Sequence, residues 1–427
     1  MGKRTQFLCL VFFPAALVVI GLMRGLVLED PGEFWQGLMA IQISPSILLH
    51  DYFAVGGFAA TLVNAGLLGL ICCLLMKLLD IDVNGPFIAA VYTVIGFAFF
   101  GKNLLNVWPI WLGVLLYART QSVSFKNFAL VAFFGTTLGP LVSVLAFGPW
   151  LHGWAAAAAA LGFGTLAGFV LPPLASHMLR FHDGYNVYNI GFTGGIVGSI
   201  VVAVLRSFSP GGFPGIEGPP MTGAYNMPIA TVLVVFSLLS LVAGVLFDRF
   251  GERSLVDRLK RIHASSGRLV SDFTTIGDHP SVMVNMGLLG MLSCGFVIAL
   301  GGDFNGPVVG GILTVVAFAA FGKHSRNCIP ILAGVVIAIL VTNWDLAENH
   351  TTPLIIAGLF GTTLAPVAGQ YGVLAGLAAG FLHVSVVMNV GFLHGGVNLY
   401  NNGFAGGFTA AVLVPIIVAL QKGAKPS

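Results

Sequence analysis

Long apolar stretches alternate with short polar breaks along the whole chain, and they predict an all-α membrane protein with many crossings. In the first half the apolar runs lie near residues 7–28, 54–79, 86–101, 104–118, 127–149, 154–175 and 190–206. In the second half they lie near residues 229–247, 281–300, 307–322, 328–342, 353–368, 371–388 and 403–421. Several hold only about 16 residues, roughly 24 Å of helix against a hydrocarbon core of about 30 Å, so we expect some short or re-entrant helices.

The second half of the chain repeats the first. Residues 63–113 align without a gap onto residues 284–334, with 23 identities in 51 positions. Further on, Phe-Gly-Thr-Thr-Leu-Gly-Pro at 134–140 matches Phe-Gly-Thr-Thr-Leu-Ala-Pro at 360–366. Such self-similarity indicates two copies of one structural unit. The expected parts are a first membrane repeat (1–206), a connecting loop rich in glycine and proline (207–227), a second membrane repeat (228–421) and a tail (422–427).

Basic residues predict how the two repeats are oriented. Lys3 and Arg4 favour a cytoplasmic N-terminus, and the six arginines and lysines of segment 248–268 favour a cytoplasmic location for that segment too. The helix before this segment corresponds to the run at 7–28, so the repeats should have inverted topology. A basic pair before the run 7–28 is also typical of a signal peptide, but the length of the run favours a membrane helix. The predicted location is the bacterial inner membrane.

Composition excludes several other classes of protein. The chain is 57% hydrophobic and 8% charged, with a mean hydropathy of +0.94, whereas soluble domains carry about 25% charged residues. A net charge of +3 without a basic, aromatic-rich patch argues against nucleic acid. The five cysteines and ten histidines show no metal or disulfide spacing, so no metal or other cofactor is expected. The expected partners are a small-molecule solute and the lipid bilayer, and a homo-oligomer is left open.

An Asn-Gly-Pro turn precedes a short apolar run in each repeat, at Asn84 and Asn305. Asparagine is a good N-cap and proline fits the first helical turn, so each turn should begin a helix. Helix starts within the membrane would present N–H groups to an anion or polar solute, whereas starts at the interface would be ordinary loops. Lys102 and Lys323 end the same short runs. They either snorkel from helix C-termini or line an anion path.

Two further repeated motifs place polar groups inside apolar runs. The first comprises Phe134, Thr136, Thr137 and Pro140, with Phe360, Thr362, Thr363 and Pro366 in the second repeat. Its hydroxyls can bind a solute, although threonine can also bond its own helix and proline can simply kink it. The second is an asparagine and tyrosine cluster before Gly-Phe-x-Gly-Gly in each repeat. It comprises Tyr185, Asn186, Tyr188 and Asn189, with Asn398, Tyr400, Asn401 and Asn402 in the second repeat. These groups either bind a solute or form an interfacial belt, because unpaired amides are costly in a membrane.

The paired motifs resemble those of a bacterial family of tandemly repeated integral membrane proteins of unknown function, over essentially the whole chain. That resemblance implies no activity. A more distant resemblance is to urea transporters, which are also built from two inverted halves with threonine-proline signatures. It implies that the two Thr-Thr-Leu-x-Pro motifs stand where that family has its selectivity slot. The Leu-Pro-x-x-Thr-x-Pro-Phe order of urea transporters is absent here.

The expected function is therefore a transporter or channel for a small polar solute or anion, with its path at the interface of two inverted repeats. The threonine and tyrosine motifs would supply hydrogen bonds at mid-membrane, and Phe134 and Phe360 would shape a constriction. No enzymatic activity is expected. The alternative is an integral membrane enzyme acting on a lipid-linked or quinone substrate. Its groups would be His324, Arg326, Asp345, Glu348 and His350, which have no counterparts in the first repeat.

Overall fold

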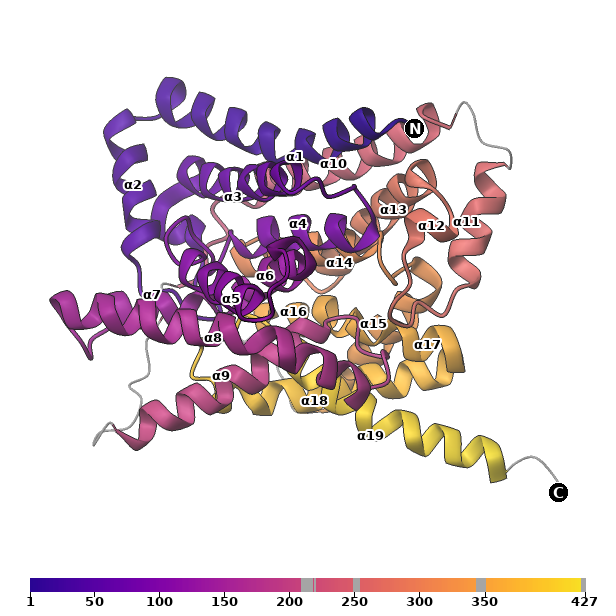
Figure 1. Cartoon of the computed structure of the whole chain (residues 1–427). Helices are drawn as coiled ribbons and strands as arrows, with labels where there is room; N and C mark the ends of the chain where they lie inside the picture. The colour runs from indigo at the N-terminus through magenta and orange to yellow at the C-terminus, as the bar shows by residue number, and fades with distance from the viewer. Residues whose placement is uncertain (209–217, 219, 249–253, 343–350, 424–427) are drawn as a thin grey trace.

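The computed structural model describes residues 1–208, 218, 220–248, 254–342 and 351–423, and all regular elements in these residues are helices (Figure 1). Ten helical segments within this part of the chain are long and apolar enough to cross a membrane, five from each repeat. The chain is thus a multi-pass helical membrane protein, as the sequence predicted. Parts of the expected connecting loop, basic segment and tail (209–217, 219, 249–253 and 424–427) lie outside the described residues.

The first repeat contains nine α-helices. They are α1 (Lys3–Met23, continued by the π-helical η1, Arg24–Leu28), α2 (Pro31–Ile43), α3 (Tyr52–Leu78), α4 (Gly85–Phe97), α5 (Trp108–Thr120), α6 (Ala129–Gly135), α7 (Gly139–Phe147), α8 (Gly153–Phe181) and α9 (Asn189–Ser207). The 3₁₀ turn η2 (Phe125–Phe128) leads into α6, and the 3₁₀ turn η3 (Thr136–Leu138) joins α6 to α7, so that these elements form one span.

The second repeat follows the same order. Its described helices are α10 (Asn226–Leu246), α11 (Leu255–Ala264), α12 (Phe273–Ile276), α13 (His279–Ala299), α14 (Gly306–Phe318), α15 (Ser325–Val341), α16 (Thr351–Gly361), α17 (Ala365–Tyr371), α18 (Val373–His394) and α19 (Asn401–Gly423). The 3₁₀ turn η4 (Thr362–Leu364) joins α16 and α17. The equivalent elements of the two repeats form seven pairs: α1 and α10, α3 and α13, α4 and α14, α5 and α15, α6–α7 and α16–α17, α8 and α18, and α9 and α19.

All fourteen predicted apolar runs are helical, and the expected short helices are present. Helices α4 and α14 each have 13 residues, about 20 Å, which is shorter than the hydrocarbon core of a membrane. The apolar-run pattern missed α2, α11 and α12, because none of them is a long apolar run. The helix α11 carries four charged residues, and α12 is a single turn.

Glycines allow the long helices to pack closely at equivalent places in both repeats. A Cβ on Gly168 of α8 would lie 2.1 Å from the backbone oxygen of Ile110 in α5, and a Cβ on Gly380 of α18 would lie 2.1 Å from that of Ile331 in α15. These distances are shorter than any normal contact. The α5–α8 and α15–α18 pairs therefore require glycine where their backbones meet.

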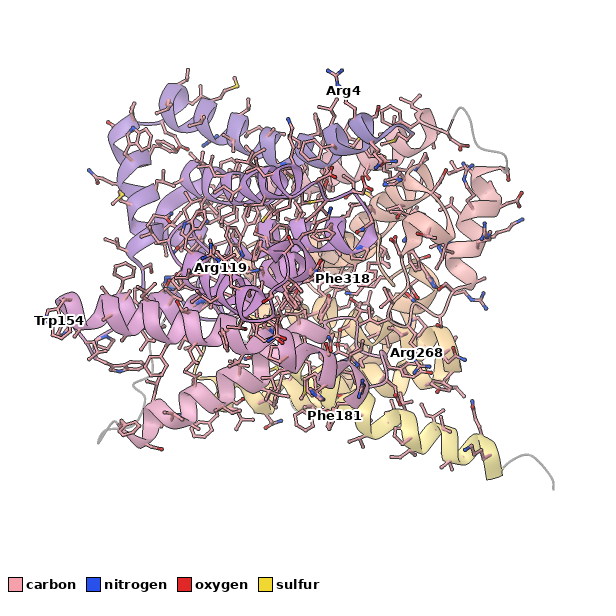
Figure 2. All side chains as sticks on the ribbon, in the orientation of Figure 1. Arg4, Arg119, Trp154, Phe181, Arg268 and Phe318 are labelled. Atoms are coloured by element: carbon pink, nitrogen blue, oxygen red, sulfur yellow. The ribbon has the colours of Figure 1, made fainter. Side chains whose placement is uncertain are left out.

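Helices α4 and α14 run antiparallel through the centre of the molecule. Gly85, at the start of α4, approaches the backbone of Ala320 just after α14, and Gly306, at the start of α14, approaches the backbone of Phe99 just after α4. Phe318, at the end of α14, lies in the middle of the protein, whereas Trp154, at the start of α8, marks one edge (Figure 2). The two short helices thus form the core around which the repeats meet.

Candidate functional site

Each short central helix begins at the expected asparagine. Asn84 accepts a hydrogen bond from the Phe87 N–H at 3.1 Å, and Asn305 accepts one from the Val308 N–H at 3.1 Å. Both side chains are therefore N-caps of the kind that the Asn-Gly-Pro turns predicted. Proline in the first turn supports both starts, since its missing N–H would have no partner there.

The first N–H groups of α4 and α14 are bound by aspartates of the opposite repeat. Gly85 N–H donates to Asp272 at 3.1 Å, and Gly306 N–H donates to Asp51 at 3.0 Å. A carboxylate at this position is favourable to the helix dipole. The structure therefore corrects the expectation of open helix N-termini that receive an anion or solute, because protein carboxylates already occupy that position.

Both spans that contain the Thr-Thr-Leu-x-Pro motif are broken at the motif. Pro140 lacks the N–H that would bond the carbonyl of Thr136, so the 3₁₀ turn η3 lets Gly139 N–H bond that carbonyl instead. The same break occurs in the second repeat, where Pro366 follows Thr362 by four residues. The repeated prolines thus produce two interrupted helices in the buried centre, where irregular backbone is tolerated only inside protein or beside water.

The second threonine of each motif binds an asparagine of the opposite repeat. Thr137 hydroxyl donates to Asn398 Oδ1 at 3.2 Å, and Thr363 hydroxyl donates to Asn186 Oδ1. The residue after each asparagine donates its backbone N–H to the carbonyl of the same threonine, at 3.1 and 3.0 Å. These contacts are reciprocal, as they would be across a two-fold axis. The two repeats are joined by polar contacts in the middle of the apolar core.

Tyr188 and Tyr400 meet at the centre of this arrangement, with ring centroids 5.1 Å apart. The backbone N–H of each tyrosine donates to the asparagine two residues earlier, at 3.1 Å in both repeats. Phe97, at the end of α4, packs on Tyr400 at 4.6 Å, and Phe318, at the end of α14, packs on Tyr188 at 4.8 Å. We call these four rings the aromatic cluster.

Lys102 and Lys323 are both completely buried beside the aromatic cluster, so neither side chain snorkels to an interface. Lys323 donates hydrogen bonds to the hydroxyls of Tyr188 and Thr362, the latter at 2.7 Å. The Lys102 ammonium lies 5.0 Å from the ring centre of Phe97 and has no hydrogen-bond partner among the described residues. The two repeats therefore differ at the lysines, although the lysines are equivalent in sequence.

A cavity of about 130 Å³ adjoins the aromatic cluster. Its walls include Phe134, Tyr188, Asn189, Phe318 and Tyr400. The cavity thus reaches both central tyrosines and one of the two phenylalanines that were predicted to shape a constriction.

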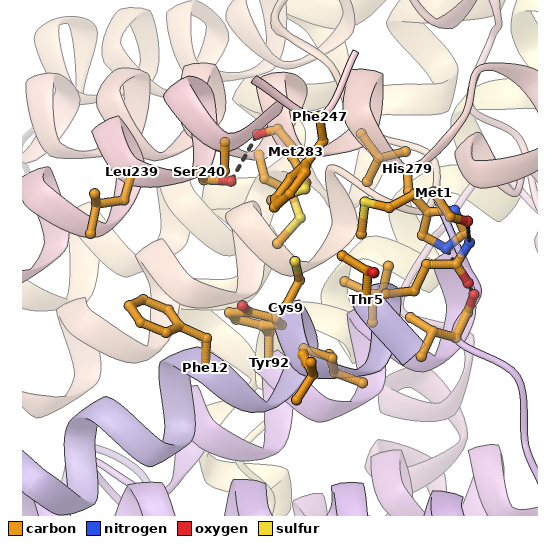
Figure 3. A pocket seen from close by; sticks show the side chains of 18 of the residues that line it. Met1, Thr5, Cys9, Phe12, Tyr92, Leu239, Ser240, Phe247, His279 and Met283 are labelled. Atoms are coloured by element: carbon orange, nitrogen blue, oxygen red, sulfur yellow. Dashed lines mark hydrogen bonds between the residues drawn. The ribbon is translucent and has the colours of Figure 1, made fainter. Parts of the chain in front are cut away.

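A larger cavity of about 450 Å³ lies between α1 and α10, with α4 and α13 as its other walls (Figure 3). Its lining is mostly apolar, with Thr5, Cys9, Tyr92, Ser240 and His279 among its few polar side chains. At the position related by the repeat, between the other ends of α1 and α10, the space is only about 10 Å³. The two ends of the α1–α10 contact are therefore packed differently.

The predicted site residues are only partly brought together. Phe360 joins the centre, 5.5 Å from the ring of Phe97. Asn189 instead bonds within its own repeat, to the Ala175 carbonyl at 3.0 Å, although it also lines the smaller cavity. Asn401 is buried at the start of α19, and its side-chain oxygen has no partner in the described part of the chain.

Asn186 and Asn398, which make the contacts between repeats, belong to the asparagine and tyrosine motif that the sequence singled out in both repeats. The motif did not indicate that these two asparagines, rather than Asn189 and Asn401, would bind the threonines. Asp51 and Asp272 were missed as helix caps, although they occupy equivalent positions 221 residues apart.

The structure describes only two of the five residues expected for an enzyme, His324 and Arg326. His324 bonds the Ser265 carbonyl at 2.9 Å, and Arg326 is exposed. Asp345, Glu348 and His350 lie outside the described residues. Across the residues that the structure describes, no group of three or more His, Cys, Asp or Glu side chains is placed to hold a metal ion.

Fold and site together define a polytopic helical membrane protein made of two repeats that meet reciprocally around a buried polar centre. The chain belongs to a family of proteins of unknown function, DUF1576, which matches residues 30–207 and 252–419. The two matched segments confirm the prediction of an uncharacterised tandem-repeat family. No curated protein and no solved structure matches the chain.

Proposed function

We propose that the protein is a transporter or channel for a small polar solute or anion, and that its path lies at the interface of two inverted repeats. The observation that carries this proposal is the reciprocal binding of Thr137 to Asn398 and of Thr363 to Asn186. Burying polar groups costs free energy unless they are paired. A purely structural membrane protein with this fold could be built from apolar packing alone. The polar groups concentrated at the two helix breaks therefore favour a solute path. In this proposal the protein moves its solute without chemical change.

An inverted arrangement of the repeats is supported by several features. Each repeat supplies five long apolar helices, an odd number, so the second repeat would start on the opposite side of the membrane from the first. The equivalent helices α4 and α14 run antiparallel. In Figure 1, α2 stands at one end of the molecule and α11 at the other, although each follows the first helix of its repeat. This plan would be similar to that of urea transporters.

We also propose that the protein resides in a bacterial inner membrane with the N-terminus in the cytoplasm. The N-terminus, the end of α19 and α11 lie at the same end of the molecule (Figure 1). Helix α11 carries Arg258, Lys260 and Arg261, and the N-terminus carries Lys3 and Arg4. Basic residues gathered at one end favour the cytoplasmic side.

The test is solute flux into proteoliposomes that contain the full chain. The screen would use urea and short amides, small carboxylates and inorganic anions, with and without a proton gradient. We expect at least one solute to enter faster than into empty liposomes. Flux of none of these solutes above that background would refute the proposal.

The threonines at the helix breaks give a sharper version of this test. We expect the double variant Thr136→Val with Thr362→Val to lose flux, because valine keeps the volume of threonine and removes the hydroxyl. The matched control is Thr231→Val with Thr342→Val, since these threonines also bond their own helices but lie away from the centre. Wild-type flux in the first variant would contradict the assigned path.

A further inference from the structure

We infer that the transported solute is a small anion, bound at the aromatic cluster by Lys102 and Lys323. This inference rests on the proposed function and names its substrate class. It starts from two ammonium groups that are completely buried in the centre of a membrane protein. A buried charge is costly unless it is paired, and charged groups inside membranes mark the paths of ions and substrates.

No protein carboxylate compensates either lysine. Among the described residues, no Asp or Glu oxygen lies within 4.0 Å of the two ammonium groups. The ionisable side chains that interact with them are Cys72, beside Lys102, and Tyr188, Cys328 and His383, beside Lys323. The central aspartates Asp51 and Asp272 bind helix N-termini instead. The described carboxylates thus supply no counter-charge to the lysines, and an anion that binds beside them would supply one.

What surrounds the lysines is suited to an anion. The Lys323 ammonium lies 4.3 Å from the ring centre of Tyr188 and donates to hydroxyl oxygens, which provide partial negative charge only. Hydroxyl groups can donate as well as accept, so Tyr188 and Thr362 can turn toward an anion that binds Lys323. A cation would be repelled by both lysines, and a neutral solute would leave their charge uncompensated.

Unpaired hydrogen-bond donors are clearest around Lys102, the lysine of the first repeat. Lys102 lies over Phe97, and Phe97 packs on Tyr400, whose hydroxyl lies near that of Thr93. The Lys102 ammonium and the hydroxyls of Tyr400 and Thr93 are all buried, and none has a hydrogen-bond partner among the described residues. Lys102 and Tyr400 both contact the Phe97 ring, and the hydroxyls of Tyr400 and Thr93 can pair with each other. The Lys102 ammonium is the donor that an acceptor with negative charge would satisfy.

The cavity at the cluster limits the size of the solute. Neither lysine lines this cavity, but Tyr188, whose hydroxyl accepts a hydrogen bond from Lys323, does line it. The volume of about 130 Å³ is roughly four times the ~30 Å³ that one water molecule occupies in the liquid. Its walls combine the two central tyrosines with apolar rings, so it suits an anion that gives up its hydration shell easily. We therefore expect anions with few non-hydrogen atoms, such as chloride, nitrate or formate, and exclude nucleotides and large dicarboxylates.

The experiment compares anion and neutral-solute flux in proteoliposomes made with the full chain. The probes are nitrate, chloride and formate on one side and urea and glycerol on the other. We expect wild-type protein to carry at least one of the anions. We expect Lys102→Met with Lys323→Met to reduce that flux about 10- to 100-fold, the effect of losing charge-assisted hydrogen bonds. Lys77→Met, at the exposed end of α3, is the matched control and should leave flux unchanged.

The outcomes separate this inference from the proposed function. Flux of urea or glycerol without flux of any anion would overturn the anion inference and leave the proposed transport function standing. Anion flux that survives in the double methionine variant would also overturn it. Flux of no probe would refute both.

A measurement of thermal stability tests the role of the lysines even if the double methionine variant folds poorly. Nitrate should raise the melting temperature of the detergent-solubilised wild type and of Lys77→Met, because a bound ligand stabilises the folded state. It should not raise that of the double methionine variant. Equal nitrate shifts in all three proteins would overturn the assignment of the lysines.

Discussion

Replacing Asp51 by alanine removes a carboxylate that accepts three hydrogen bonds at the place where the two repeats meet. The carboxylate is completely buried and accepts from the backbone N–H groups of Phe53, Gly306 and Thr222, each at 3.0 Å. At about 1–1.5 kcal/mol for each lost bond, the substitution should lower the free energy of unfolding by roughly 3–5 kcal/mol. Asp51→Asn keeps one acceptor oxygen, so its cost should be about 1–2 kcal/mol.

The measurement is unfolding of the purified protein in micelles by added SDS, followed by tryptophan fluorescence. The matched control is Asp30→Ala, because Asp30 also caps a helix through two backbone N–H groups but lies at the surface. We expect that control to cost about 1 kcal/mol. If Asp51→Ala proved no more destabilising than Asp30→Ala, the role of Asp51 in joining the repeats would be wrong.

Two further predictions concern packing and surface charge. In the same SDS titration, Gly168→Ala should destabilise the protein by about 1–3 kcal/mol or more, because its Cβ would meet the Ile110 backbone. The control Gly162→Ala, on the same helix but with open space around it, should be neutral or slightly stabilising. The Lys3 ammonium lies 2.7 Å from the Asp82 carboxylate and holds the pKa of Asp82 below its usual value. The stabilisation from this exposed pair should therefore be present at neutral pH and disappear as the pH falls through that lowered pKa. Melting temperatures of wild type and Asp82→Asn should converge at high salt, and a difference that persists there would contradict a screened surface pair.

Hydropathy predicted most of the helices because a segment in lipid must satisfy its backbone hydrogen bonds internally. Every long apolar run is therefore helical, and the short runs that became α4 and α14 were recognised by their length. Helix α11 is not an apolar run, because its sequence is largely polar and its apolar residues lie on one face only. Helix α2 combines an Asp30 N-cap with Pro31, which are ordinary start signals, but its run is too short to stand out.

The candidate site was only partly predictable, since its contacts join residues far apart in the chain. The repeated threonine and tyrosine motifs indicated which segments matter, but not that Thr137 would bind Asn398 rather than its neighbour Asn401. The Asn-Gly-Pro turns predicted helix starts correctly. The hydrogen bond from the Gly85 N–H, at the start of α4, to Asp272, 187 residues further along the chain, depends on how the repeats meet. The burial of Lys102 and Lys323 likewise follows from tertiary packing rather than from their position after a helix.

The exchange of contacts between the repeats has a consequence for how the protein is made. Thr137 binds Asn398, which is 261 residues further along the chain, so at 5–20 residues per second the ribosome supplies this partner roughly 15–50 s after the threonine. During that time the first repeat is in the membrane with its central hydroxyl lacking its final partner. Stable insertion of the first repeat therefore depends on synthesis of the second, and two separately translated halves should assemble only when both are present in the same membrane.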